Sequence, residues 1–262
     1  MECRPSRAVF SRAGKSPVGR RILNRFSGSR GVFRNFEEGW AAARKTGMPG
    51  HEDPNEVAVH MELAKSLRAS DYPALLWLLG ASAYGHGIKV FDFGGNVGNL
   101  FYSYSPYLNR SGPIDWTVLD IPPVLERGRK IAAERNAEGL RFASSAAEFR
   151  DDQVLLVSGA LHYWEGPIAE FLEQFPVLPR HIIVNRSPVS EKEEPFVVVQ
   201  RTATCAFPCV VRNADGMLAE FAAEGYTLVD RWAASELRLS LPLFPEHSVP
   251  HYSGFYLRHQ RV

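Results

Sequence analysis

Residues 89–98 read KVFDFGGNVG, and this stretch decides the fold. The apolar residues up to Asp92 predict a buried strand, the glycines predict a tight turn, and a helix is expected to begin near Gly98. Without a Cβ atom, Gly94, Gly95 and Gly98 let the backbone pass close to a ligand. In open parallel sheets, ligands bind at such turns beyond the carboxyl ends of the strands. We therefore expect an α/β fold with a ligand site here, the alternative being a tight connection without a ligand.

The spacing of the glycines excludes two phosphate-binding motifs. FGGNVG supplies neither G-x-G-x-x-G nor GxxxxGK[ST]. The pattern is acid-x-Gly-x-x-x-Gly, with Asp92 at the end of the strand. A carboxylate at that position suits a ligand with an amino group better than a pyrophosphate. S-adenosylmethionine is such a ligand.

A second acid strengthens the case for a nucleoside ligand. Asp120 ends the next predicted strand, WTVLD, 22 residues after Gly98. A carboxylate at the end of the second strand can accept hydrogen bonds from both ribose hydroxyls, as in other nucleoside-binding α/β folds. Taken alone, an aspartate at a strand end is usually a helix cap or a turn residue.

The rest of the chain alternates strands and helices. Strands are expected at Val90–Phe93, Trp116–Asp120, Arg141–Ala143, Val154–Ser158 and Ile182–Asn185, and helices at Gly98–Tyr107, Pro123–Asn136 and Pro167–Phe175. This order predicts a parallel sheet with helices on both faces. A helix over Gly216–Glu224 and two strands, Tyr226–Trp232 and Gly254–His259, predict an antiparallel hairpin at the end of the chain.

The N-terminal third is expected to be helical after a basic arm. Residues 1–34 hold nine Lys or Arg and one acid, a net charge of +8; because the whole chain carries +1, the remaining residues carry −7. We expect a flexible, solvated arm, with contact to RNA, an anionic membrane or an acidic partner as alternatives. Helices are expected at Asn35–Lys45, Glu56–Ala69 and Tyr72–Leu79, with Asn35 as a cap.

The chain resembles the class I S-adenosylmethionine-dependent methyltransferases, and within them a bacterial group often encoded near polysaccharide loci. The matching stretches lie within residues 33–260: NFEEGWAAA, VFDFGGNVGNLF, WTVLDIPPVLERGRKIA, VLLVSGALHYW, IIVNRSPV, VVVQR and EGYTLVDRW. Two positions depart from the family pattern. Asn96 stands where a glycine is usual, and Asn185–Arg186 stands where an Asp–Arg pair is expected.

The resemblance implies a Rossmann-like, doubly wound, mostly parallel seven-stranded sheet with an antiparallel C-terminal hairpin. It divides the chain into a basic arm (1–34), a small helical segment (35–86) and a domain that binds S-adenosylmethionine (87–262). It also implies the residues of the cofactor site. Asp92, Gly94, Gly95, Asn96 and Gly98 would face the methionine part, Asp120 and Ile121 the ribose and the adenine edge, Ser144 or Ser145 the adenine, and Ser158, Gly159 and Ala160 the sulfonium.

Candidates for catalysis lie in the same half of the chain. If the methyl acceptor is a hydroxyl group, a general base helps, and His162 follows the fourth strand at the expected cofactor end. A structural histidine is the alternative reading, with His247 and His251 as other candidate bases. The connections 186–214 and 239–253 are predicted lids, in which Arg186 and Arg201 could bind an anionic group of the acceptor.

Composition limits the classes of function. Hydrophobic residues make up 45% of the chain and charged residues 23%, which disfavours disorder and coiled coil. The three cysteines can supply no four-thiolate zinc site, no metal is expected, and Cys205 and Cys209 are expected to be free or buried thiols. With no apolar leader or membrane span, we expect a cytoplasmic enzyme that O-methylates a small molecule or a sugar or polysaccharide precursor, with homodimerisation left open. A nucleic-acid methyltransferase and a silent cofactor-binding module are the alternatives.

Overall fold

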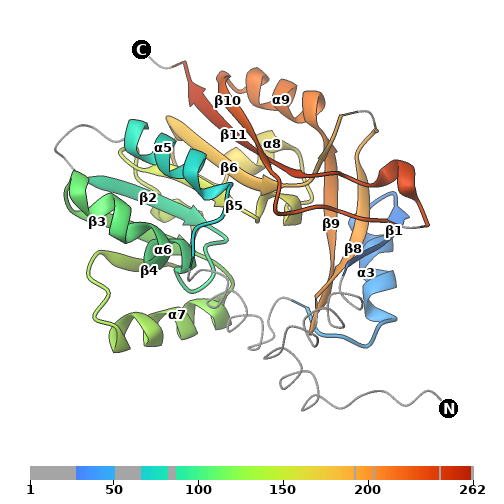
Figure 1. Cartoon of the computed structure of the whole chain (residues 1–262), viewed down its shortest axis with the longest axis horizontal. Helices are drawn as coiled ribbons and strands as arrows, with labels where there is room; N and C mark the ends of the chain where they lie inside the picture. Colours follow the sequence, from blue (N-terminus) through green and yellow to red (C-terminus); the bar gives the residue numbers. More distant parts are fainter. Residues whose placement is uncertain are drawn as a thin grey trace.

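A seven-stranded sheet forms the main body of the molecule (Figure 1). This computed structural model describes residues 28–50, 66–81, 87–191, 193–202, 204–241 and 243–260. The strand order is β10-β11-β6-β5-β2-β3-β4. The strands are β2 (Ile88–Phe93), β3 (Ile114–Leu119), β4 (Leu140–Ala143), β5 (Val154–Ser158), β6 (His181–Ser187), β10 (Tyr226–Ala234) and β11 (Tyr252–His259).

The central strands are parallel, and β11 runs antiparallel to both of its neighbours. The predicted fold class is therefore confirmed, including the closing hairpin of β10 and β11. The strand β2 lies between β3 and β5, where the order of the strands along the chain reverses. This is the switch point at which ligands bind in open α/β sheets.

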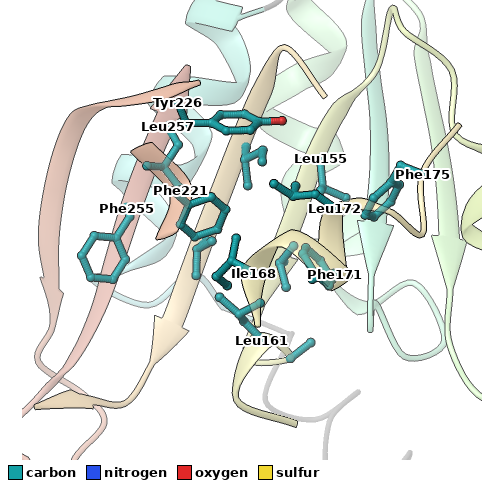
Figure 2. Packing of buried hydrophobic residues seen from close by; sticks show 14 of the residues in the cluster. Leu155, Leu161, Ile168, Phe171, Leu172, Phe175, Phe221, Tyr226, Phe255 and Leu257 are labelled. Atoms are coloured by element: carbon teal, nitrogen blue, oxygen red, sulfur yellow. The ribbon is translucent and has the colours of Figure 1, made fainter. Parts of the chain in front are cut away.

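Helices cover both faces of this sheet, because its strands present apolar side chains on both faces. One face packs against α5 (Asp71–Ala81) and α6 (Asn99–Leu108), and the other against α8 (Ile168–Leu172) and α9 (Ala214–Ala223). Within β2, Ile88 and Val90 point to the first face and Phe91 to the second. Figure 2 shows the second core, where Phe171, Phe221 and neighbouring side chains fill the space between helices and sheet. The helix α7 (Pro122–Glu134) packs against β4.

The N-terminal helical segment is confirmed in part. The helix α3 (Phe36–Arg44) begins where predicted, and the side chain of Asn35 accepts a hydrogen bond from the amide of Glu38 at 2.9 Å. The helix α5 matches the predicted Tyr72–Leu79. The predicted helix over Glu56–Ala69 lies outside the described residues up to residue 65, and residues 66–70 form bends and turns.

A second sheet corrects two predictions. It has the order β1-β8-β9-β7, with β1 (Gly28–Phe33), β7 (Val189–Ser190), β8 (Phe196–Arg201) and β9 (Ala206–Asn213). Residues 186–214, which were predicted to be a lid, are therefore largely sheet. Residues 28–33, which were predicted to belong to a flexible arm, pair antiparallel with β8. The apolar, alternating residues of these segments bury one face against α3 and the other against the β10–β11 connection. Residues 1–27 of the predicted arm lie outside the described residues.

The second sheet stands beside the carboxyl ends of the central strands, which we call the carboxyl edge (Figure 1). The link is the short 3₁₀ turn η3 (Leu161–Tyr163), which follows β5. The hydroxyl of Tyr163 donates to Oε1 of Gln200 in β8 at 3.0 Å, and its ring meets Phe207 of β9 edge-on. The connection 239–253, the second predicted lid, contains η4 (Pro245–His247) and is anchored by the buried side chains of Leu239, Leu241 and Val249.

No helix in the described part of the chain is both long and apolar enough to cross a membrane. The remaining 3₁₀ turns are η1 (Asn109–Ser111) and η2 (Ala146–Glu148).

Candidate functional site

The turn between β2 and α6 has a backbone that few residues can adopt. Gly94, Asn96 and Gly98 have φ angles of 71°, 55° and 88°. Asparagine is among the residues other than glycine that most readily adopt this left-handed conformation, so Asn96 fills the position where the family pattern has glycine. A Cβ atom on Gly94 would lie 2.4 Å from Cβ of Ala160, and space at that position therefore also requires glycine. We call residues 94–98 the glycine loop.

Asp92 lies buried beneath the glycine loop, with only 1% of its surface exposed. Its Oδ2 accepts a hydrogen bond from Nε1 of Trp116 at 3.0 Å, and its Oδ1 has no hydrogen-bond partner among the described residues. Burial raises the pKa of Asp92 to about 7; the bond from Trp116 opposes the rise and the charge of Asp120 adds to it. A buried acceptor without a partner is rare, and Oδ1 is therefore the atom of this side chain left for a donor from a ligand.

Asp120 connects the end of β3 to the glycine loop. Its Oδ2 accepts from the amide of Asn96 at 2.8 Å, and its Oδ1 from the amide of Ile121 at 2.7 Å. Burial raises the pKa of Asp120, while these two backbone hydrogen bonds oppose the rise. Each carboxylate oxygen can accept more than one hydrogen bond, so both retain capacity for hydroxyl donors. The two acids predicted to share a site are thus brought to one loop, with the half-exposed Ile121 beside them.

Ser144 and Ser145 follow β4 and are bonded to their own turn. The amide and hydroxyl of Ser144 donate to Oε1 of Glu148 at 2.7 and 2.8 Å, and Oγ of Ser145 accepts from the amide of Ala147. The bonds from Ser144 hold the pKa of Glu148 below its usual range. Glu148 was not predicted as a site residue, although Ser-x-x-Glu at 145–148 is the pattern of a capping box. An adenine contact by either serine stays a prediction.

The end of β5 lies beside the glycine loop. Oγ of Ser158 is buried without a hydrogen-bond partner among the described residues. The next residue, Gly159, has a φ of 72°, and a Cβ atom built there would meet nothing within 4 Å. Its amide donates to the carbonyl of Asn185 in β6 at 2.8 Å. Ser158, Gly159 and Ala160 therefore lie beside the glycine loop, with open space at Gly159, and their contact with a sulfonium stays a prediction.

The predicted base, His162, lies in η3 two residues after Ala160 and is 5% exposed. Its ring centre is 4.1 Å from that of Tyr163 and 6.2 Å from that of Tyr252. His251 precedes β11, and its Nδ1 donates to the carbonyl of Tyr252 at 3.1 Å. Because Ser253 pairs with Ser187 at the end of β6, His251 also lies at the carboxyl edge. His247 lies in η4 against Phe196.

Arg186 is not the open anion-binding group that the sequence suggested. Only 12% of its side chain is exposed, and its Nη2 donates to Oδ1 of Asp71 at 2.7 Å. Its Nε donates to Oγ of Ser70 at 3.0 Å and lies 3.7 Å from Oε1 of Glu236. Nε and Nη2 of the guanidinium are thus bonded inside the protein, and a role of Arg186 in binding the acceptor stays a prediction. Sequence reasoning missed all three partners.

Asn185, the other departure from the family pattern, is explained by the same region. Its Nδ2 donates to the carbonyl of Ser70 at 3.2 Å, and its Oδ1 accepts from Nε1 of Trp232 and from the amide of Arg186. An ionised aspartate could accept the last two bonds but could not donate the first.

Other polar groups of residues 186–214 contact the protein itself. Arg212 donates through Nη2 to the carbonyls of Trp164 and Gly166, and Nη2 of Arg201 lies 3.4 Å from Sδ of Met48. Cys205 and Cys209 are buried thiols that form no disulfide with a described residue, and burial raises the pKa of Cys209 to about 12. Among the described residues, no cluster of three or more His, Cys, Asp or Glu side chains is arranged to hold a metal ion.

Comparison with solved structures finds similar chains at low identity. A Burkholderia thailandensis 1,6-didemethyltoxoflavin-N1-methyltransferase, solved with its acceptor and S-adenosylhomocysteine, is 19% identical with a TM-score of 0.49 over 74% of this chain and 80% of that one. A Synechocystis magnesium protoporphyrin IX methyltransferase with S-adenosylhomocysteine gives 15% and 0.46, over 77% and 83%. A glycopeptide N-methyltransferase with S-adenosylhomocysteine gives 12% and 0.48, over 74% and 90%. No protein-family model matches the chain. No curated protein sequence matches it either.

Proposed function

We propose that this protein is an S-adenosylmethionine-dependent methyltransferase. The observation that carries the proposal is the joined geometry of the glycine loop and Asp120. Three residues of the loop have positive φ angles, and the amide of Asn96 is held by the carboxylate that ends the neighbouring strand. This arrangement lies at the switch point of the sheet, where β2 is flanked by parallel strands on both sides.

The residues present fit this cofactor. Oδ1 of Asp92 and Oγ of Ser158 are buried acceptors without described partners, and Gly159 faces open space. An ammonium group, two ribose hydroxyls and a sulfonium are groups that carboxylates and small polar side chains can accommodate. Asp92 and Ser158 would face the methionine part, and Asp120 the ribose.

When bound, S-adenosylmethionine supplies an electrophilic methyl group on sulfur, which an acceptor displaces in line. The chain contributes mainly by holding groups in position, which can account for much of such a reaction's rate. The glycine loop, the end of β5 and η3 form one side of the site, and the second sheet stands across the carboxyl edge from the central strands. The hydrogen bond from Tyr163 to Gln200 joins η3 to the second sheet.

We assign proton removal from a hydroxyl acceptor to His162, with His251 as the alternative. The position of His162 supports this role. It lies two residues after Ala160, whose Cβ packs against Gly94 of the glycine loop. Its burial beside Tyr163 and Tyr252 keeps the imidazole in one orientation. The acceptor we propose is a small molecule or a sugar or polysaccharide precursor, methylated at oxygen.

The experiment is calorimetric titration of the full chain with S-adenosylmethionine and S-adenosylhomocysteine, together with methyl-release assays over small-molecule and sugar acceptors. We expect Asp120→Ala to weaken binding by about tenfold to a hundredfold, the loss expected when charged hydrogen bonds are removed. Asp115→Ala is the matched control, because Asp115 lies at the opposite end of the same strand and is paired with Arg141 and Arg150. Equal affinities in folded Asp120→Ala and wild-type protein would remove Asp120 from the site.

A further inference from the structure

A buried polar network connects the start of α5 to the carboxyl edge. Its members come from segments far apart in the chain: Ser70 and Asp71 precede or begin α5, Tyr104 lies in α6, Arg186 in β6 and Glu236 after β10. Ser70, Asp71 and Tyr104 are buried. None of these contacts is needed to form a single helix or strand, so the network joins elements to one another.

Asp71 is the centre of this network. Its Oδ1 accepts from the hydroxyl of Tyr104 at 2.6 Å and from Nη2 of Arg186 at 2.7 Å. Its Oδ2 accepts from the amide of Arg68 at 2.7 Å. Only 3% of the residue is exposed, so water does not compete with these bonds. Such short charged bonds in a buried setting are among the strong hydrogen bonds of proteins.

Asp71 thereby holds a strained β-bulge near the end of β6, where the pairing of this strand with β11 shifts register. Arg186 has a φ of 55°, a conformation that costs free energy for a residue with a long side chain. Its guanidinium is fixed by Asp71 on one side and by Ser70 on the other, and Ser70 in turn donates to Glu236. The surrounding structure must supply this restraint if a strained backbone is to persist.

The strained β-bulge at Arg186 adjoins the proposed cofactor site through one residue, Asn185. Asn185 precedes Arg186, pairs with Ser158 in the sheet, and accepts from the amide of Gly159 through its carbonyl. Gly159 is the residue that faces open space beside the glycine loop. A shift of the peptide between residues 185 and 186 would therefore move the carbonyl of Asn185, which accepts from the amide of Gly159.

We infer that Asp71 is a positioning residue for the cofactor site, acting through Arg186 and the carbonyl of Asn185 on Gly159. This inference rests on the proposed function and assigns a role in it to the N-terminal segment. Asp71 does not touch the cofactor. The charges in the network balance, since Arg68 and Arg186 face Asp71 and Glu236, so removing the carboxylate of Asp71 leaves two cations facing one carboxylate.

The test is calorimetric titration of full-length Asp71→Asn with S-adenosylhomocysteine, beside unfolding in urea. We expect the dissociation constant to rise about tenfold or more, as for loss of a buried charged hydrogen bond. Asp230→Asn is the matched control. Asp230 also anchors α5, because it accepts a hydrogen bond from Nε1 of Trp77 at 2.7 Å, but it does not contact the β-bulge at Arg186. Its dissociation constant should stay within about twofold of the wild type.

The double variant Asp71→Asn with Arg186→Gln separates positioning from stability. Removing both charges should restore part of the stability, because no cation is left unpaired. The affinity for S-adenosylhomocysteine should stay low, because no side-chain contact with Asp71 then holds the β-bulge at position 186. Recovery of affinity in parallel with stability would overturn the inference.

Two further outcomes are decisive. If Asp71→Asn does not fold, Arg186→Lys replaces it; this variant keeps the charge but not the fork that reaches Asp71 and Ser70 together, and it should bind several-fold more weakly. Wild-type affinity in the folded variant would overturn the positioning role alone. No binding of S-adenosylhomocysteine by the wild type would instead overturn the proposed function and this inference with it.

Discussion

Replacing Gly95 by alanine tests how tightly the glycine loop is fitted to the acid beneath it. A Cβ atom at this position would lie 2.5 Å from both Cγ and Oδ2 of Asp92. Real Cβ atoms do not approach so closely, so the loop or the carboxylate must move. Asp92 is buried, and moving it would break its bond from Trp116.

The size of the effect follows from these two contacts. Overpacking of a close-packed interior costs ~1–3 kcal/mol. Losing the hydrogen bond to a buried carboxyl group adds ~1–3 kcal/mol. We therefore expect Gly95→Ala to lower the free energy of unfolding by ~2–5 kcal/mol, since the two losses are partly alternative ways to relieve one clash.

The assay is urea unfolding at pH 7, followed by tryptophan fluorescence. Gly216→Ala in α9 is the matched control, because the added Cβ would lie at ordinary contact distance, 3.5 Å from Oδ1 of Asn213. As a helical position, it should be neutral or gain up to ~1 kcal/mol. A Gly95→Ala protein within ~0.5 kcal/mol of the wild type would show that the loop is not packed on Asp92 as described.

Two other predictions concern buried polar groups. Asn185→Asp loses the donor to the carbonyl of Ser70 while keeping the acceptor for Trp232, and should lower the free energy of unfolding by ~1–3 kcal/mol at pH 7; an unchanged urea midpoint would refute the network. Burial raises the pKa of Asp92 to about 7, above its value in the unfolded chain, so protonation of Asp92 favours the folded state. The free energy of unfolding should therefore fall as the pH rises from about 4 to 7, by up to ~1.4 kcal/mol per pH unit. Asp92→Asn should remove that slope, so its stability relative to the wild type should increase between pH 5 and 8, and a difference independent of pH would contradict the buried, ionisable Asp92.

The central strands and the glycine loop were predictable because their signals are local. VFDFGG encodes a buried strand and its turn within a few residues, and the position of Asp120 follows from the next strand in the same way. Even the positive φ of Asn96 could be expected, because the methyltransferase pattern that the sequence resembles has a glycine at that position. The pairing of the Asn96 amide with Asp120 could be expected only once the strands were known to be neighbours.

The second sheet could not be predicted from local patterns. Its strand β1 pairs with β8, more than 160 residues later in the chain. The β1 segment reads GSRGVF, in which only Val32 and Phe33 are apolar, so it carries no strand signal of its own. The basic composition of residues 1–34 pointed to a solvated arm instead. Pairings of this kind depend on long-range packing, which overrides what the individual segment indicates.

The network at Asp71 could not be predicted because the position of this aspartate already has a sufficient local explanation. An aspartate at the start of a helix is expected to cap it or to favour its dipole. Asp71 does accept from the amide of Arg68, but its other oxygen reaches Arg186, 115 residues further along the chain. Nothing in the sequence distinguishes this second role.

A crystal structure of the chain grown with S-adenosylhomocysteine would show whether the glycine loop holds the cofactor. We expect the ligand along the glycine loop, with the ribose hydroxyls donating to Asp120 and the amino group donating to Oδ1 of Asp92. This binding mode also places the sulfur beside Gly159. Ligand bound elsewhere on the chain, or none at a concentration that saturates other S-adenosylhomocysteine-binding proteins, would contradict it.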